Sequence, residues 1–402
     1  MMKTVYIFLI FILSFLSLNA QQAENIYQKA YAEYLIGHFD KAYSVLNKET
    51  LPVYGKDKYL MLKGDILFAK NKFDDALTCY KEAFKLKNKK AGLKIAETYS
   101  LLGEPYKAAE FLKYYLKSHD KMLQSEIKKI PAFSKMENTK AWVDLWKEKY
   151  YSGYETKLDE ARYAAFTKED YALAFDIADK LIIRNPKRHK AYELRGDIFM
   201  KQKDYKSAAN SYKKAAELKK RNAIYKTKAA NALYLAGKYK QAAGIYDAII
   251  KDKFYNPQIL LNKAQNETAL KKYKLASQDL NLFLSYFPEN PRALYLAGKL
   301  NQINGEYINA LENYNNAIKK DGSKPEYFIS CADTYLQTKT YESAIKNYSM
   351  ALDLNPKLPE VWYKKGIAEL KSYKYKEGCE DLKKAKFLKY NKADDYIIKY
   401  CK

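Results

Sequence analysis

The stretch that decides the fold is PEYFISCADTYLQTKTYESAIKNYSMALDLNPKL, which runs from Pro325 to Leu358. The same pattern recurs on both sides of it with a period of 34 residues. A tyrosine stands at one position of seven consecutive rows: Tyr171, Tyr205, Tyr239, Tyr273, Tyr307, Tyr341 and Tyr375. A fixed period of this length indicates a repeat architecture, so it is interpreted before any local motif.

Two further columns hold small residues. We number each row from column 1, with the repeated tyrosine at column 17. Column 20 holds Ala174, Ala208, Ala242, Ala276, Ala310, Ala344 and Gly378. Column 8 holds Arg162, Gly196, Ala230, Ala264, Gly298, Ala332 and Gly366. A small residue in the middle of a helix lets the backbone of a partner helix approach closely, and Arg162 departs from this rule.

The column spacing predicts two antiparallel helices in each row. Columns 17, 20, 24 and 27 are three or four residues apart, which places them on one face of a second helix. Pro186, Pro288 and Pro356 at column 32 end that helix before the next row begins. Gly237 and Gly305 mark the turn inside a row. The predicted fold class is therefore all-α.

This pattern resembles the tetratricopeptide repeat (TPR) family. The last row, with Trp362, Gly366, Tyr375 and Ala385, is similar to the W…G…Y…A signature of that family. The resemblance implies a TPR superhelical solenoid of antiparallel helix pairs with a C-terminal capping helix. It also implies that the first helices line a concave groove that binds a protein or peptide.

The chain divides into five expected segments. Residues 1–20 are predicted to be a secretory signal peptide, because Lys3 precedes an apolar run from Val5 to Leu18 that ends near the small residue Ala20. We expect an N-terminal block of about three TPR repeats in 21–121, a non-repeat helical insert in 122–154, seven TPR repeats in 155–392 and a capping helix in 393–402. An uncleaved membrane anchor is the alternative for 1–20, and we expect no membrane-spanning segment after cleavage.

The insert contains two of the three tryptophans of the chain, Trp142 and Trp146. Their helical spacing favours a joint in which aromatic rings fill the space between two repeat blocks. An exposed aromatic patch for a partner is the alternative. A similar insert occurs in secreted TPR proteins of Gram-negative bacteria, which this chain resembles.

The charge is strongly basic, with 72 Lys and Arg against 47 Asp and Glu, a formal net charge of +25. Such an excess attracts phosphate, anionic lipid or acidic polymers at low salt. In the row from His189, however, seven lysines fall in the turn and on the second, outer helix, which favours a solvated surface: Lys201, Lys203, Lys206, Lys213, Lys214, Lys219 and Lys220. Nucleic acid is therefore not the expected partner.

Neither a catalytic nor a metal site is expected. His38, His119 and His189 lie in different rows without a neighbouring cluster of Cys, Asp or Glu at the spacing of metal ligands. Carboxylates such as Asp279 and Asp381 are interpreted as ordinary surface charge. The expectation is a protein that is not an enzyme and needs no cofactor.

The four cysteines are Cys79, Cys331, Cys379 and Cys401. Cys379 and Cys401 are candidate disulfide partners in an oxidising compartment, and the secreted TPR proteins that this chain resembles carry the same pair. Cys79 and Cys331 are far apart in the array, and we expect both to be buried as small apolar residues.

The expected function is that of a secreted scaffold which binds a protein or peptide in its groove. An adaptor of an envelope or secretion complex and a binder of anionic polymers are alternatives. The expected location is periplasmic or envelope-associated. The resemblance implies that columns 2, 5, 9 and 12 of the first helices face the ligand. One candidate ligand is an acidic or C-terminal peptide group. The candidate site residues are Asn231, Gln265, Arg292, Tyr295, Lys299 and Gln302.

Overall fold

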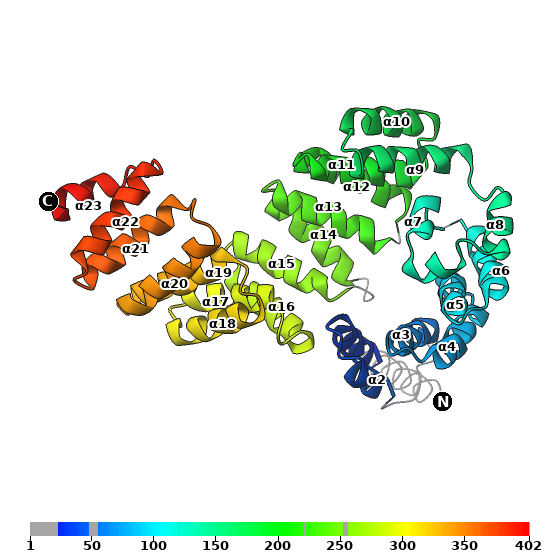
Figure 1. Cartoon of the computed structure of the whole chain (residues 1–402), viewed down its shortest axis with the longest axis horizontal. Coiled ribbons are helices and arrows are strands. Elements are labelled where there is room, and N and C mark those ends of the chain that lie inside the picture. Colours follow the sequence, from blue (N-terminus) through cyan, green and yellow to red (C-terminus); the bar gives the residue numbers. More distant parts are fainter. Residues whose placement is uncertain (1–22, 48–54, 120, 221, 252–255, 402) are drawn as a thin grey trace, which may run out of the picture. The chain divides into compact units, whose positions relative to one another are not determined.

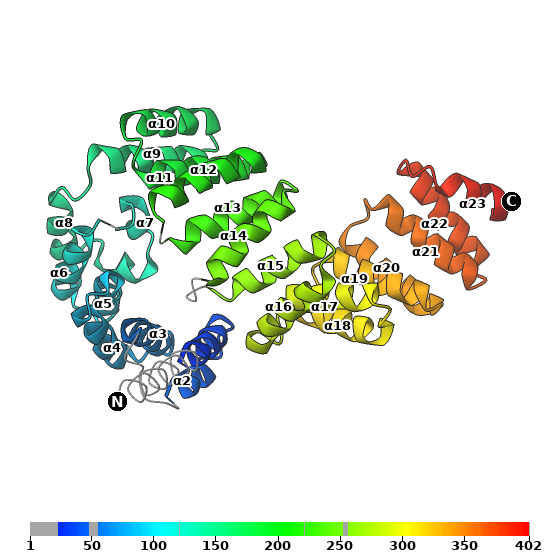
Figure 2. The same cartoon turned by 180° about the vertical axis from the view of Figure 1, so that it is seen from behind.

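The computed structural model describes residues 23–47, 55–119, 121–220, 222–251 and 256–401. The predicted signal peptide, 1–20, lies outside them. The chain forms two compact units, Met1–Asn256 and Pro257–Lys402, which Figures 1 and 2 show from opposite sides. The boundary between the units falls inside the predicted seven-repeat segment 155–392.

The first unit is helical throughout its described part, and residues 23–35 form its first helix. Its further helices are α2 (Phe39–Asn47), α3 (Lys56–Ala69), α4 (Phe73–Lys85), α5 (Lys89–Leu101), α6 (Pro105–Leu116), α7 (Gln124–Lys128), the 3-10 helix η1 (Pro131–Met136), α8 (Lys140–Lys147), α9 (Gly153–Phe166), α10 (Tyr171–Arg184), α11 (His189–Lys201), α12 (Tyr205–Leu218), α13 (Ala223–Leu235) and α14 (Tyr239–Lys251).

The second unit continues the same alternation of first and second helices. Its helices are α15 (Gln258–Ala269), α16 (Tyr273–Tyr286), α17 (Pro291–Ile303), α18 (Tyr307–Lys320), α19 (Pro325–Gln337), α20 (Tyr341–Leu354), α21 (Pro359–Lys371), α22 (Tyr375–Phe387) and α23 (Ala393–Tyr400). The described residues contain no β-strand, so the predicted all-α class is confirmed.

Close contact between the two helices of a repeat explains the small residues at column 8. A Cβ atom on Gly196 would lie 2.6 Å from the ring of Tyr212, which stands at column 24 of the same repeat. A Cβ on Gly298 would likewise lie 2.6 Å from the ring of Tyr314. The aromatic ring of the second helix therefore packs directly on the backbone of the first helix.

The turn inside each repeat has a fixed conformation. The residue at column 15 has a positive φ in all seven rows, from Glu169 (55°) to Gly305 (81°). This left-handed conformation ends the first helix and directs the chain into the second. Glycine adopts it without strain, which explains Gly237 and Gly305, whereas the other five rows have other residues there.

The insert joins the N-terminal helices through a buried aromatic cluster. Trp142 is 6% exposed and packs with Phe133, their ring centroids 5.5 Å apart. The hydroxyl of Ser100 on α5 donates a hydrogen bond of 2.6 Å to the carbonyl oxygen of Ala132. The burial of Trp142 argues against an exposed patch for a partner. Its apolar cluster consists of residues of the N-terminal block and the insert, so Trp142 packs the insert on that block.

The C-terminal helix α23 packs against the last helix pair. Tyr396 contacts Tyr363 of α21 with ring centroids 5.7 Å apart, and Ala393 is fully buried. The sulfur atoms of Cys379 and Cys401 lie 2.03 Å apart, at bonding distance. Formation of this disulfide in the native compartment stays a prediction: two reactive thiols under denaturing, non-reducing conditions would support it and four would contradict it. Cys79 and Cys331 are buried free thiols, as predicted.

Candidate protein-binding site

Five of the six candidate residues lie in the second unit, on α15 and α17. The guanidinium of Arg292 donates a hydrogen bond to the side-chain oxygen of Gln265 on the preceding first helix. Arg292 and Lys299 are exposed, whereas the other three are partly buried. The face formed by columns 2, 5, 9 and 12 of the first helices, which we call the first-helix face, is thus polar here and linked from repeat to repeat.

Tyr295 contacts three other side chains of this part of the face. Its ring lies 4.7 Å from that of Tyr327, and its hydroxyl accepts a hydrogen bond of 3.2 Å from Ser330. The ammonium of Lys299 stands 5.7 Å from the centre of the Tyr295 ring. Burial raises the pKa of Tyr295, so its hydroxyl stays protonated at neutral pH.

Gln302 bridges two repeats. Its side-chain oxygen accepts a hydrogen bond of 3.0 Å from Tyr314, and its nitrogen donates one of 3.1 Å to Gln337. A ligand that used Gln302 would therefore have to replace contacts that already exist. Arg292 and Lys299 remain the candidates best placed to meet an anionic group.

Asn231 lies in the first unit, on α13, and has a structural partner. Its side-chain oxygen accepts a hydrogen bond of 2.6 Å from the hydroxyl of Tyr246. The same link between columns 24 and 9 joins Tyr80 to Asp65, Tyr212 to Asp197 and Tyr348 to Asp333 at 2.5–2.7 Å. In these four repeats the tyrosine of the second helix thus holds a polar side chain of the first-helix face in place.

Arg162 occupies the column that is small in the other six rows. It can do so because column 24 of its own repeat is Ala178, which is fully buried and has no ring to meet a long side chain. The guanidinium of Arg162 lies 5.6 Å from the centre of the Phe166 ring. The exchange of a small and a large residue between the two columns brings a cation to the first-helix face.

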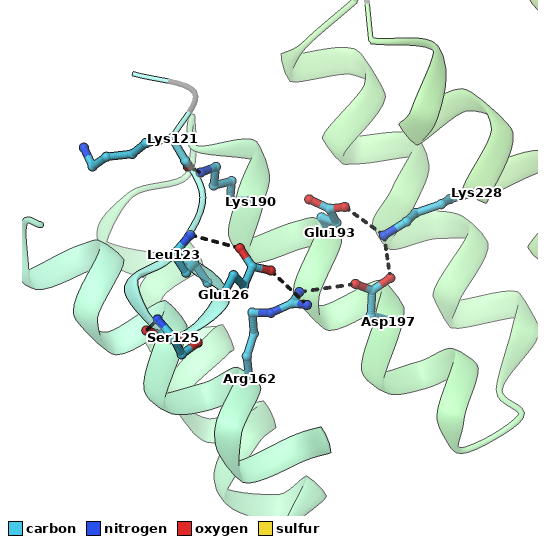
Figure 3. Close-up of polar contacts among 10 residues, drawn as sticks. Lys121, Leu123, Ser125, Glu126, Arg162, Lys190, Glu193, Asp197 and Lys228 are labelled. Carbon is cyan, nitrogen blue, oxygen red and sulfur yellow. Dashed lines mark hydrogen bonds and ion pairs between the residues drawn. The ribbon is translucent and has the colours of Figure 1, made fainter. Parts of the chain in front are cut away.

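A chain of ion pairs surrounds Arg162 (Figure 3). Its guanidinium lies 3.3 Å from Glu126 of the insert and 3.8 Å from Asp197 of the next first helix. Glu126 also accepts a hydrogen bond of 2.9 Å from the backbone nitrogen of Leu123. The insert is therefore tied to the repeat segment by charge as well as by apolar packing.

Lys228 continues this network on the following first helix. Its ammonium lies 2.7 Å from Glu193 and 2.8 Å from Asp197 (Figure 3). Burial lowers the pKa of Lys228, but the two carboxylates outweigh this effect and raise it. Burial and the Asp197 carboxylate together raise the pKa of Tyr212, so this hydroxyl remains a donor.

An open surface pocket of about 360 Å³, which we call the cavity, lies at this network. It is lined by Arg162, Phe166, Asp197, Met200, Lys201 and Tyr212. The lining combines an aromatic ring and a thioether with charged groups that are already oriented by one another. Such a mixture suits a side chain of a protein ligand with an apolar body and a polar end.

Glu193, Asp197 and Lys228 were not among the site residues predicted from the sequence. Glu193 and Asp197 stand at columns 5 and 9, the same columns that selected Tyr295 and Asn231, so this signal was present. Lys228 stands at column 6, which the resemblance did not assign to the ligand face. The partners of Arg162 could be found only after the helices were placed in space.

Two findings concern other kinds of site. Across the described ranges, His, Cys, Asp and Glu nowhere form a group of three or more that could hold a metal ion. None of the helices in the described part of the chain is long and apolar enough to cross a membrane.

The fold and this face define a helical-repeat scaffold, a class whose members bind other proteins. Models described as TPR repeat or tetratricopeptide repeat match residues 57–90, 160–224 and 332–372. A model described as the intraflagellar transport protein 70 C-terminal domain matches residues 193–264. The chain is a protein of the tetratricopeptide repeat family.

Relatives match the chain at low identity. A TPR repeat-containing protein of Methanocaldococcus jannaschii is 24% identical over 361 residues, which cover 82% of this chain and 63% of that protein. Photosystem I assembly protein Ycf3 of Synechococcus elongatus is 33% identical over 88 residues, 20% of this chain and 51% of that protein. The chain thus spans less than two thirds of the length of either relative.

A solved structure supports the fold. The structure titled APC/C hetero-tetramer Cut9-Hcn1 aligns with a TM-score of 0.50 and 15% sequence identity, covering 93% of this chain and 82% of that chain. At this identity the likeness shows a common fold and not a common function.

Proposed function

We propose that this protein is a secreted TPR scaffold that binds a partner protein, or an extended peptide of it, along its first-helix faces. TPR proteins generally mediate protein–protein interaction or assembly without catalysing a reaction. The observation that carries the proposal for this chain is the cavity between Phe166 and Met200, with Arg162 and Asp197 beside it.

The network around the cavity supports this choice. Asp197 accepts a hydrogen bond from Tyr212 and forms ion pairs with Arg162 and Lys228. These polar groups are therefore held in place before a ligand binds. Preorganised polar groups cost less entropy on binding than mobile ones. In the second unit, exposed Arg292 and Lys299 would add charge-assisted hydrogen bonds to an acidic or C-terminal peptide group.

Secretion is part of the proposal and rests on the first 20 residues of the sequence. The compartment would be the periplasm or the envelope, and an envelope or secretion complex would be the source of the partner. Sequencing the N-terminus of the mature protein tests this point. A mature chain that starts at Gln21 supports secretion, and one that retains Met1 in the cytoplasm contradicts it.

Capture of the partner tests the binding proposal. The protein is cross-linked in native envelopes and the captured partner is identified; the capture is then repeated with the double variant Arg292→Glu and Lys299→Glu. We expect capture to fall at least tenfold while helicity and melting stay unchanged, because both side chains are exposed.

The matched control is the double variant Lys319→Glu and Lys346→Glu. It changes the charge of the same unit by the same amount, but on exposed positions of the second helices α18 and α20. Equal loss of capture in both double variants would indicate binding through net charge, as for an anionic polymer. Undiminished capture by the Arg292 and Lys299 variant would exclude these residues from the binding surface.

A further inference from the structure

Two buried clusters in the second unit repeat the same three residue types. One consists of Lys263, Glu267 and Asp279 in the pair α15 and α16. The other consists of Lys365, Glu369 and Asp381 in the pair α21 and α22. Both sets occupy columns 7, 11 and 23, three repeats apart. Among the described residues, one lysine of each cluster forms ion pairs with two carboxylates.

The cluster of the last repeat is almost closed to solvent. Glu369 is 3% exposed and Asp381 is 8% exposed. The ammonium of Lys365 lies 3.1 Å from Oε1 of Glu369 and 2.7 Å from Oδ2 of Asp381. The expectation that Asp381 is ordinary surface charge is therefore wrong, because Lys365 from the partner helix draws it into the interface.

The cluster in α15 and α16 has the same geometry. The ammonium of Lys263 lies 2.7 Å from Oε1 of Glu267 and also pairs with Asp279. Glu267 is 4% exposed, while Asp279 is partly buried. Because the same three residue types recur at the same columns of two repeats, we interpret the cluster as a recurring structural feature and not as a chance burial of one charge.

The second oxygen of each glutamate lacks a donor. Oε2 of Glu267 and Oε2 of Glu369 are buried without a hydrogen-bond partner, yet an aspartate carboxylate lies within hydrogen-bonding reach of each glutamate. Two carboxylates can form a hydrogen bond only if one of them carries a proton. Each cluster is therefore complete when it holds one additional proton.

The electrostatics agree with this geometry. Burial and the neighbouring Asp381 raise the pKa of Glu369 to about 7, although Lys365 opposes the shift. Burial also raises the pKa of Glu267, and Asp279 adds to that effect. A single ammonium does not compensate two buried carboxylates.

Carboxylates on the helices that neighbour α21 and α22 form ion pairs with lysines outside this cluster. On α19, Asp333 pairs with Lys364; on α20, Glu342 pairs with Lys374; on α23, Asp394 pairs with Lys386. The charged groups that act on Glu369 are Lys365 of its own helix and Asp381 of α22. The protonation state of Glu369 thus depends on its own cluster.

We propose that these two clusters are proton-dependent locks that hold their helix pairs together while a proton is shared and release them when it is lost. Folded Glu369 binds its proton more tightly than an unfolded glutamate does. Its contribution to stability is therefore complete below about pH 4.5 and is lost as the pH rises through about 7. Helices α21 and α22 would open more readily in mildly alkaline than in mildly acidic surroundings.

Hydrogen exchange of the full mature chain tests the proposal. Protection factors, corrected for the intrinsic pH dependence of exchange, are measured for peptides of α21 and α22 between pH 5 and pH 8. We expect protection to fall by about tenfold or more across this range. In the variant Glu369→Gln, which keeps a neutral donor in place of the proton, we expect protection to be nearly independent of pH.

The control is Glu377→Gln, which removes an exposed carboxylate from the partner helix α22 and should behave as the parent protein. A parent protein whose protection does not change with pH would overturn the proposal, as would an unchanged pH dependence in Glu369→Gln. If Glu369→Gln does not fold, carboxyl NMR of the parent protein decides: a midpoint near pH 7 for Glu369 supports the lock, and one near 4.5 refutes it.

Discussion

Arg162 and Ala178 show how single residues define the candidate site. Six rows place a small residue at column 8, and in several of them a tyrosine of the second helix packs on it; this row reverses the sizes. The reversal brings a guanidinium to the first-helix face, where Glu126 and Asp197 hold it. The local chemistry of the face therefore depends on a pair of residues and not on Arg162 alone.

Placing a tyrosine at column 24 of this repeat tests the pairing of Arg162 with Ala178. Ala178→Tyr should destabilise the protein by about 1–3 kcal/mol, because the new ring has to share its space with Arg162. Adding Arg162→Gly should recover most of that loss, since the chain already uses glycine with tyrosine at Gly196 and Tyr212. The midpoint of chemical denaturation measures both effects. A stable Ala178→Tyr variant, or no recovery in the double variant, would contradict the pairing.

Other single residues were harder to predict. Glu267 and Glu369 both stand at column 11, and the sequence alone did not indicate which groups their charges would contact. Asp381 looked like surface charge because a helix pattern does not reveal which side chain of the partner helix lies opposite. The lysine at column 7 decides the burial of these carboxylates.

At the scale of elements, the 34-residue period predicted the helix pairs well. Pro288 and Pro356 follow the ends of α16 and α20, and the column 15 residue ends the first helix in all seven rows. These features depend on neighbours in the chain, so the sequence contains them directly. The insert has no period, and its packing on α5 and α6 depends on contacts between distant residues.

Replacing Trp142 tests the role of the insert. Because Trp142 is buried among apolar side chains, Trp142→Ala should destabilise the protein by about 3–5 kcal/mol. Val143→Ala, one residue further on the same helix, is the control, since Val143 is 51% exposed and should have little effect. Thermal melting compares the two. Normal melting of the Trp142 variant together with weaker partner binding would favour the exposed patch.

At the scale of the whole molecule, the sequence predicted the family and the fold but not the division at Asn256. Five of the six candidate site residues share the first-helix face of the second unit, whereas Asn231 belongs to the first unit. Gln265 and Gln302 already form hydrogen bonds with neighbouring side chains. The position of a residue in the repeat therefore predicts that it lies on the first-helix face, but it does not predict whether its polar group is already engaged.

In the proposed function, a partner protein occupies the first-helix face. A photo-activatable amino acid at Met200, which lines the cavity, tests it most directly in native envelopes. The control position is Asn210, an exposed residue of the second helix α12 in the same repeat. We expect one discrete crosslinked partner from position 200 and little or none from position 210. Equal labelling from both positions, or labelling from position 210 alone, would contradict it.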